Sequence, residues 1–172
     1  MAIKYVGEKN PQHLFNYFSV RFAFFETIPF LAIMISAYIS ISHSQRKPLE
    51  ESLQAIITTL ARSGIVSFVF MDSYSFDDSQ SAEMMQQAMK DIDQCDLLIA
   101  ETSHKAIGIG VEAGYARAKN KPVIYLRQQE AEHSSTMAGI SDFQVIYKNP
   151  ADLKAQLSAA VAEILKARTT GA

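Results

Sequence analysis

The sequence has a single cysteine, Cys95, among its 172 residues. One cysteine cannot form an internal disulfide, and Cys95 lies where a helix is expected to run into a buried strand. We interpret it as a core side chain of a protein from a reducing compartment, and we expect a cytoplasmic location. A catalytic thiol is the alternative at this position.

The sequence also lacks metal-binding motifs and any concentration of positive charge. It contains no CxxC or HExxH pattern, and its four histidines do not have the spacing of metal ligands. The formal net charge is -2, and lysines and arginines are scattered along the chain. We therefore expect no metal site, and the absence of a basic stripe argues against binding to nucleic acid.

The first 33 residues differ in composition from the rest of the chain. They hold six of the ten phenylalanines, and residues 22–41 are apolar enough to raise the question of a membrane span. Glu26 and Pro29 count against a span, and the C-terminal half of that window, residues 33–41, is needed as the first strand of the domain. We expect residues 1–33 to be an extension of uncertain structure, with a packed helix or a membrane anchor as alternatives, and residues 34–172 to form one domain.

From Ile33 onward, short apolar runs alternate with amphipathic segments. The apolar runs predict strands, and leucines and isoleucines at helical spacing predict helices between them. Strands are expected at residues 33–41, 66–71, 96–100, 122–126 and 143–147, helices at 47–62, 81–95, 108–120 and 153–165, and a long connection at 128–141.

Five strands joined by helical crossovers predict an α/β fold. We expect a doubly wound, flavodoxin-like or Rossmann-like five-stranded parallel sheet flanked by helices, because right-handed crossovers leave few other ways to bury both faces. In such folds ligands bind at the carboxyl ends of the strands, near the switch in strand order. Four loops lie there: residues 40–45, 72–80, 101–110 and 128–136.

A glycine-bearing turn after the third expected strand places one acidic side chain. Gly108 and Gly110 open a helix, and we expect Glu112 in its first turn, where the helix dipole favours an ionised carboxylate. The glycines would let the backbone approach a ligand or a neighbouring strand. Glu112 could be a nucleophile or a base, and it could equally be a helix cap.

The segment from Asp91 to Arg127 resembles the nucleoside 2-deoxyribosyltransferase family and its deoxynucleoside 5′-monophosphate N-glycosidase relatives. The resemblance is carried by an aspartate before an apolar strand, a polar loop, the run GIGVEAG, and an asparagine before Lys121-Pro122. It implies that Glu112 attacks the anomeric carbon of a 2-deoxyribose and that the covalent glycosyl-enzyme is resolved by a second base or by water. It implies no cofactor.

The resemblance also implies a homodimer or a higher homo-oligomer. In the family, a serine of the loop after the fourth strand reaches the substrate phosphate of the neighbouring subunit. Thr136 falls at that position, and Ser135 lies beside it.

Two departures from the family pattern are single residues. Ala88 stands where the family has its second acid, and Ala106 stands where its monophosphate hydrolases have a serine. Glu101, at the end of the third strand, could replace the missing acid and share a crevice with Glu112, or it could be a strand-end carboxylate bound by loop amides. Asp72, Asp77, Asp78 and His104 are further candidates.

The loop after the first strand is polar where the family has glycines. Ser42 and His43 could form a small anion-binding turn with Arg46 close behind, or they could only make the turn and cap the helix. Tyr38 is an alternative source of the aromatic hydroxyl that the family has in its first strand, although its register differs.

These observations predict cleavage or transfer at the N-glycosidic bond of a nucleoside or nucleotide, a small-molecule substrate. The alternative is a non-catalytic nucleotide-binding module of the same fold. The predicted catalytic residues are Glu112 and Glu101, and the predicted substrate contacts are Ser40, Ser42, His43, Gly108, Gly110, Ser135 and Thr136.

Overall fold

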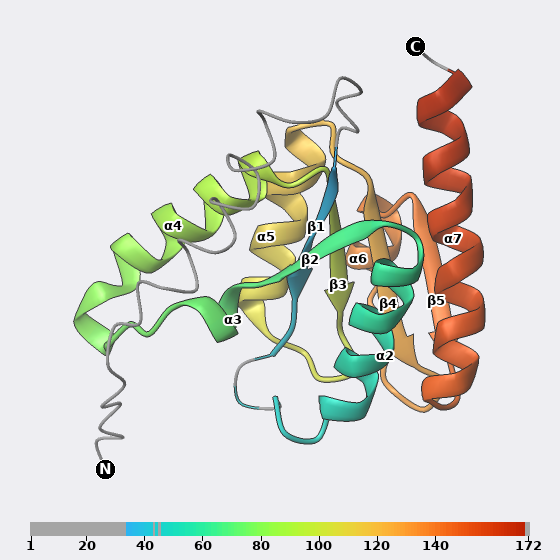
Figure 1. Ribbon diagram of the computed structural model, residues 1–172. Helices are drawn as coiled ribbons and strands as arrows, with labels where there is room; N and C mark the ends of the chain where they lie inside the picture. The colour runs from blue at the N-terminus through green and yellow to red at the C-terminus, as the bar shows by residue number, and fades with distance from the viewer. Residues whose placement is uncertain (1–33, 43, 45, 171–172) are drawn as a thin grey trace.

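The computed structural model describes residues 34–42, 44 and 46–170. Its centre is a parallel sheet with the strand order β2-β1-β3-β4-β5 (Figure 1). This arrangement confirms the predicted doubly wound α/β fold, and the strand order switches between β1 and β3. The strands are β1 (Ile35–Ser40), β2 (Ile65–Val69), β3 (Leu97–Glu101), β4 (Val123–Gln128) and β5 (Phe143–Tyr147).

Helices cover both faces of the sheet (Figure 1). Helices α2 (Glu50–Arg62) and α7 (Pro150–Thr170) pack on what we call the α2/α7 face. Helices α4 (Ser81–Gln94), α5 (Ile107–Ala118) and α6 (Ser135–Ile140) pack on the opposite one, the α4/α5 face. Between β2 and α4 the chain forms the short helices α3 (Phe70–Ser73) and η3 (Asp78–Gln80).

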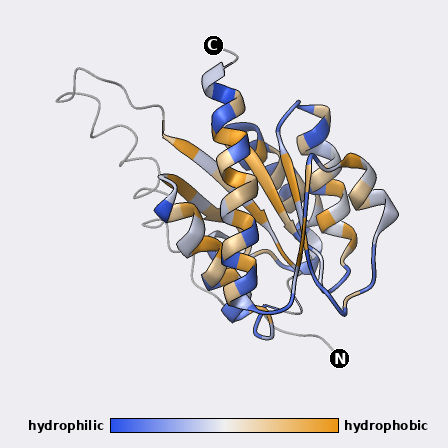
Figure 2. Ribbon diagram, turned by 90° about the vertical axis from the view of Figure 1, so that its right-hand side faces the viewer, coloured by the Kyte–Doolittle hydropathy of each residue, from blue (hydrophilic) through white to orange (hydrophobic). Residues whose placement is uncertain are grey.

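The strands are apolar on both sides because both sides are covered (Figure 2). In β1, for example, Ala37 and Ile39 belong to the core of the α2/α7 face, whereas Tyr38 belongs to the core of the α4/α5 face. This alternation, which follows from the two-residue repeat of a strand, decides which face each strand-end side chain reaches.

Two elements differ from the sequence-based expectation. The second strand ends at Val69, and the following four residues, expected to be strand and loop, form α3. The expected long connection at 128–141 contains α6, whose first turn is capped by Ser134: its Oγ accepts a hydrogen bond from the amide of Met137 at 3.3 Å. A six-residue helix is too short to show a periodic apolar face, so the pattern of residues could not reveal it.

Cys95 is buried in the core of the α4/α5 face, and burial raises the pKa of its thiol to about 12. It is a core side chain, as its position in the sequence indicated. The expected N-terminal extension, residues 1–33, lies outside the described residues. In the part of the chain that the structure describes, none of the helices combines the length and apolarity needed to cross a bilayer.

Candidate functional site

Glu112 lies in the second turn of α5, because the helix begins at Ile107, before the first of the two glycines. The expectation of a first-turn position was therefore wrong, and the first turn of α5 has no acidic residue. Since the influence of the helix dipole falls off within the first turn, the dipole contributes less to this carboxylate than its neighbours do.

Both carboxylate oxygens of Glu112 accept hydrogen bonds from β1. The Tyr38 hydroxyl donates to Oε1 at 2.9 Å, and the Ser40 hydroxyl donates to Oε2. Tyr38 and Ser40 are two residues apart and therefore point to the same face of the sheet. Glu112 is carried by the helix that follows β3, so these bonds join β1 to α5 at the point where the strand order switches.

The surroundings of Glu112 act on its pKa in opposite directions. Burial raises the pKa of the carboxyl group, whereas the hydrogen bonds from Ser40 and Tyr38 lower it, and the pKa remains above its ordinary value. The pKa of the Tyr38 phenol is also raised, first by burial and then by the charge of Glu112. Tyr38 thus stays protonated and acts as a hydrogen-bond donor to Glu112.

The glycines of α5 are not required by packing inside the chain. A β-carbon placed on Gly108 or Gly110 would meet no other atom within 4 Å, and neither residue has a positive φ. A close approach to a neighbouring strand therefore does not explain them. Gly108 lies one helical turn before Glu112 on the same side of α5 and is exposed, which leaves room for a ligand that approaches the carboxylate.

The loop after β1 is only partly described. Ser42 is buried, and its hydroxyl lies 3.3 Å from that of Ser44, whereas His43 lies outside the described residues. The Arg46 guanidinium donates to both carboxylate oxygens of Asp72, at 3.3 and 3.1 Å, and to Glu50. Its charge is thus already balanced by two acids, which weakens the prediction that this turn binds an anion.

Glu101 does not share the surroundings of Glu112. It follows Leu97 and Ile99 on the α2/α7 face, where it is fully buried. The Tyr147 hydroxyl donates to its Oε1 at 2.9 Å, and the hydroxyl and amide of Ser103 donate to it as well. The expected crevice with both glutamates is therefore not formed, because alternation along β3 turns Glu101 away from α5.

The two hydroxyl residues of the fourth loop have no hydrogen bond to Glu112 in the described part of the chain. Ser135 and Thr136 are exposed at the start of α6, and the hydrogen bonds to the Glu112 carboxylate come from Tyr38 and Ser40. In the same region, Lys105 and Glu132 form an exposed ion pair of 2.6 Å that links the loops after β3 and β4.

Sequence reasoning missed the polar residues of α4 that lie on the same face as Glu112. Asp91 is buried there, and Tyr74 and Gln87 donate hydrogen bonds to it. The usable signal was its spacing: Asp91 is three residues after Ala88 and so lies on the same inward side of the helix.

Comparison with known proteins relates this arrangement to one family. The family model for nucleoside 2-deoxyribosyltransferase matches residues 42–164, well over half of the chain. A comparison with curated proteins gives no match.

Three solved structures share the fold. The CMP N-glycosidase BcmB of Clostridium botulinum has a TM-score of 0.54 and 18% identity, covering 72% of this chain and 98% of its own. A conserved protein from Enterococcus faecalis V583 has a TM-score of 0.54 and 17% identity, and the match covers 74% of this chain and 99% of that protein. The 2-deoxyribosyltransferase of Bacillus psychrosaccharolyticus has a TM-score of 0.50 and 16% identity, and the match covers 69% of this chain and 90% of that protein.

Proposed function

The chain belongs to the nucleoside 2-deoxyribosyltransferase family, and we propose that it breaks the N-glycosidic bond of a nucleoside or nucleotide with Glu112 as the nucleophile. The observation that carries this proposal is the pair of hydroxyl donors from β1, one on each oxygen of the Glu112 carboxylate. Two donors fix the plane of the carboxylate, and an oriented nucleophile needs less reorganisation to reach the reacting carbon.

In the first step, a carboxylate oxygen of Glu112 forms a bond to the anomeric carbon of the sugar. The bond from that carbon to the base nitrogen breaks, its electron pair stays on the nitrogen, and the base takes up a proton from water. In the second step, the oxygen of water or the nitrogen of a second base attacks the same carbon, the bond to Glu112 breaks with release of its carboxylate, and the attacking group gives its proton to the hydroxide left by the first step. Water gives hydrolysis, and a second base gives transfer.

Tyr38 and Ser40 support this chemistry as positioning residues. Their hydrogen bonds favour the ionised form of Glu112 and so oppose the effect of burial on its pKa. The same bonds must weaken as the carboxylate becomes an ester, which helps to release it in the second step. Ser40 is thus assigned to the nucleophile and not to the substrate.

The substrate is a small molecule, and we propose that a neighbouring subunit completes its site. Ser135 and Thr136 are exposed at the start of α6 and are not among the hydrogen-bond donors to Glu112 of their own chain, so they are available to the site of a second copy. Measuring the oligomeric state by light scattering tests this assignment, and a monomer that turns over substrate would contradict it.

The direct test incubates the protein with 2-deoxynucleosides and with their 5′-monophosphates, each with and without an acceptor base, and separates the products by chromatography. We expect free or exchanged base from at least one class. Acid quenching followed by mass spectrometry should find a sugar adduct on the peptide that contains Glu112, because ester intermediates survive at low pH.

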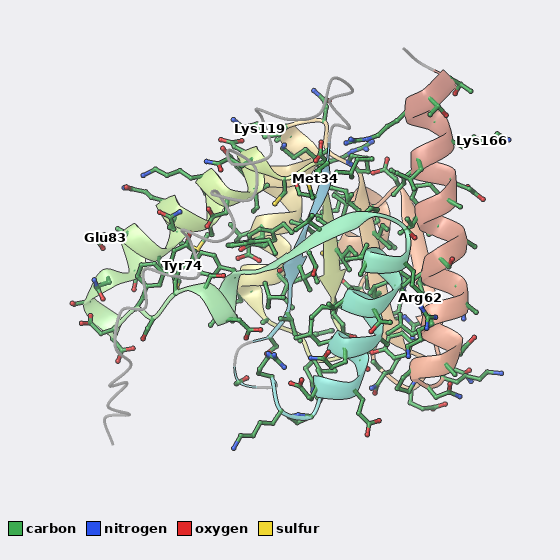
Figure 3. The ribbon with its side chains drawn as sticks, in the orientation of Figure 1. Met34, Arg62, Tyr74, Glu83, Lys119 and Lys166 are labelled. Carbon is green, nitrogen blue, oxygen red and sulfur yellow. The ribbon has the colours of Figure 1, made fainter. Side chains whose placement is uncertain are left out.

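Two variants make this test specific. Glu112→Ala should release no base and form no adduct, whereas Glu83→Ala, which removes an exposed carboxylate at the outer end of α4 (Figure 3), should behave as the wild type. Base release that survives Glu112→Ala would contradict the assigned nucleophile.

A non-catalytic binding module is the second candidate, and Ala88 is the observation that favours it. Ala88 is buried in α4 and offers no acid at the position where the family has one. The module is supported if the wild type binds a deoxynucleoside in equilibrium dialysis but releases no base.

A further inference from the structure

Asp91 is a buried acid that the proposed chemistry leaves without a role. It lies on the inward side of α4 with Ala88 and Ile92, and its exposed fraction is 6%. Its Oδ2 atom is buried and has no hydrogen-bond partner among the described residues. A buried polar atom without a partner destabilises a fold, so a group that keeps one calls for a functional explanation.

The other carboxyl oxygen of Asp91 is fully engaged. Oδ1 accepts hydrogen bonds from the Tyr74 hydroxyl at 3.3 Å and from Nε2 of Gln87 at 3.1 Å. Nε2 of Gln87 also donates to the Tyr74 hydroxyl at 3.0 Å, so the three side chains form a closed network. The network ties the segment that carries Tyr74, between α3 and η3, to the middle of α4 (Figure 3).

Tyr74 belongs to a group of rings that leads to the nucleophile. Its ring centroid lies 5.0 Å from that of Phe70 and 5.8 Å from that of Phe76, and the rings of Phe70 and Phe76 are stacked at 6.0 Å. We call these three residues the aromatic wall. The ring centroid of Phe70 in turn lies 6.2 Å from that of Tyr38, whose hydroxyl donates a hydrogen bond to Glu112.

We propose that Asp91 is a positioning residue that holds Tyr74, and with it the aromatic wall, in the arrangement against which the planar base of the substrate stacks. The proposal rests on the proposed function, because it assumes a substrate with a base. Aromatic side chains bind bases through their faces, and such contacts need correctly placed rings.

The chemistry of Asp91 fits this role better than a direct role in bond breaking. Oδ2 is buried and Oδ1 already accepts two hydrogen bonds, so neither oxygen is open to a substrate. Burial raises the pKa of Asp91, while Gln87, Tyr74 and the neighbouring Lys90 lower it, and the pKa stays above its ordinary value. A neutral carboxyl still accepts hydrogen bonds on Oδ1, so the network does not require a charge.

Two substitutions at Asp91 separate positioning from packing. Asp91→Leu removes the acceptor for Tyr74 and Gln87 and also removes the atom without a partner. Asp91→Asn retains a neutral carbonyl acceptor. We expect Asp91→Leu to raise KM for 2-deoxynucleosides about fivefold or more, with kcat within about twofold and Tm not lowered, whereas Asp91→Asn should keep KM near the wild-type value.

Tyr74→Phe provides an independent route if Asp91→Leu does not fold. It removes only the hydroxyl that Asp91 binds, and it should raise KM as Asp91→Leu does. The double variant should have a KM no higher than that of either single variant, because both substitutions break the same contact. An unchanged KM in both Asp91→Leu and Tyr74→Phe overturns the proposal, and so does a fall in kcat at constant KM.

The failure of this proposal can be distinguished from the failure of the proposed function. If the wild type binds a deoxynucleoside without releasing base, only the proposed function fails, and Asp91→Leu must then weaken the Kd about fivefold or more. If the protein neither binds nor cleaves deoxynucleosides, both proposals are overturned.

Discussion

Two glutamates at the carboxyl-terminal edge of the sheet have nearly the same polar partners and opposite surroundings. Glu112 is bound by the hydroxyls of Tyr38 and Ser40, and Glu101 is bound by the hydroxyls of Tyr147 and Ser103. In both, burial raises the pKa and the hydroxyl donors lower it. A tyrosine and a serine around a buried carboxylate therefore do not by themselves identify a reactive group.

The difference lies in what else each carboxylate can reach. Glu101 is closed in beneath α2, where the Tyr147 hydroxyl also donates to Ser52 Oγ at 3.1 Å, and it has no exposed surface. Glu112 is only partly buried and lies beside an exposed glycine of its own helix. We infer that Glu101 holds β3, β5 and α2 together, while Glu112 is available to a substrate.

The largest expected effect separates the two glutamates by activity. Glu112→Gln should lower base release by about a thousandfold or more, because the amide cannot attack the anomeric carbon. Glu101→Gln should retain activity within about twofold. Rates of base release measured by chromatography decide the comparison, and equal losses of activity in the two variants would show that the two glutamates do not differ in role.

The same Glu112→Gln variant should be at least as stable as the wild type at neutral pH. Folding raises the pKa of the Glu112 carboxyl. Such a group stabilises the fold at any pH below the pKa that it has in the unfolded chain, and this contribution is lost as the pH rises through the pKa that it has in the folded protein. The neutral amide has no such loss. Urea denaturation at pH 5 and pH 8 should therefore show a smaller decrease with pH for Glu112→Gln than for the wild type.

The second effect concerns stability at Glu101. Glu101→Leu should lower the free energy of unfolding by about 1–3 kcal/mol, because it removes the acceptor that the hydroxyls of Tyr147 and Ser103 share. Activity per folded molecule should stay close to that of the wild type. Urea denaturation gives the stability, and Glu101→Gln, which keeps a carbonyl acceptor, is the matched control.

A smaller effect tests the donors to Glu112. Ser40→Ala and Tyr38→Phe each remove a bond that lowers the pKa of this carboxyl, so the ionised form should appear only at higher pH. We expect kcat/KM at pH 6 to fall about tenfold and kcat/KM at pH 8 to fall less. A pH profile with an unshifted acid limb would show that the hydroxyls do not control the ionisation of Glu112.

The smallest effect tests the exposed side of α5. Gly108→Ala should raise the free energy of unfolding by up to about 1 kcal/mol, because alanine favours a helix and its methyl group has free space. It should also raise KM a few-fold if the substrate passes over Gly108. Gly114→Ala has the same space but points elsewhere on the helix, so its KM should not change.

Much of the fold was predictable from the sequence, because the alternation of apolar runs and amphipathic segments is visible without a structure. The missed helix α6 is too short for a periodic signal, and α3 continues an apolar strand without a break in composition. The glycine-bearing turn after β3 was enough to make Glu112 a candidate, and its role as the nucleophile stays a prediction. The hydrogen-bond partners of Glu112 were harder to predict, since Tyr38 is 74 residues away in the chain.

The sequence by itself determined the order of the elements, the parallel sheet and the helix that carries Glu112. Only the tertiary structure decided that Glu112 meets Tyr38 and Ser40 while Glu101 faces the other way. The physical reason is that the central strands are buried on both faces, so most of their residues are apolar and show no alternation that would assign a side chain to one face. Which polar groups meet then depends on the strand order and on the helices above each face.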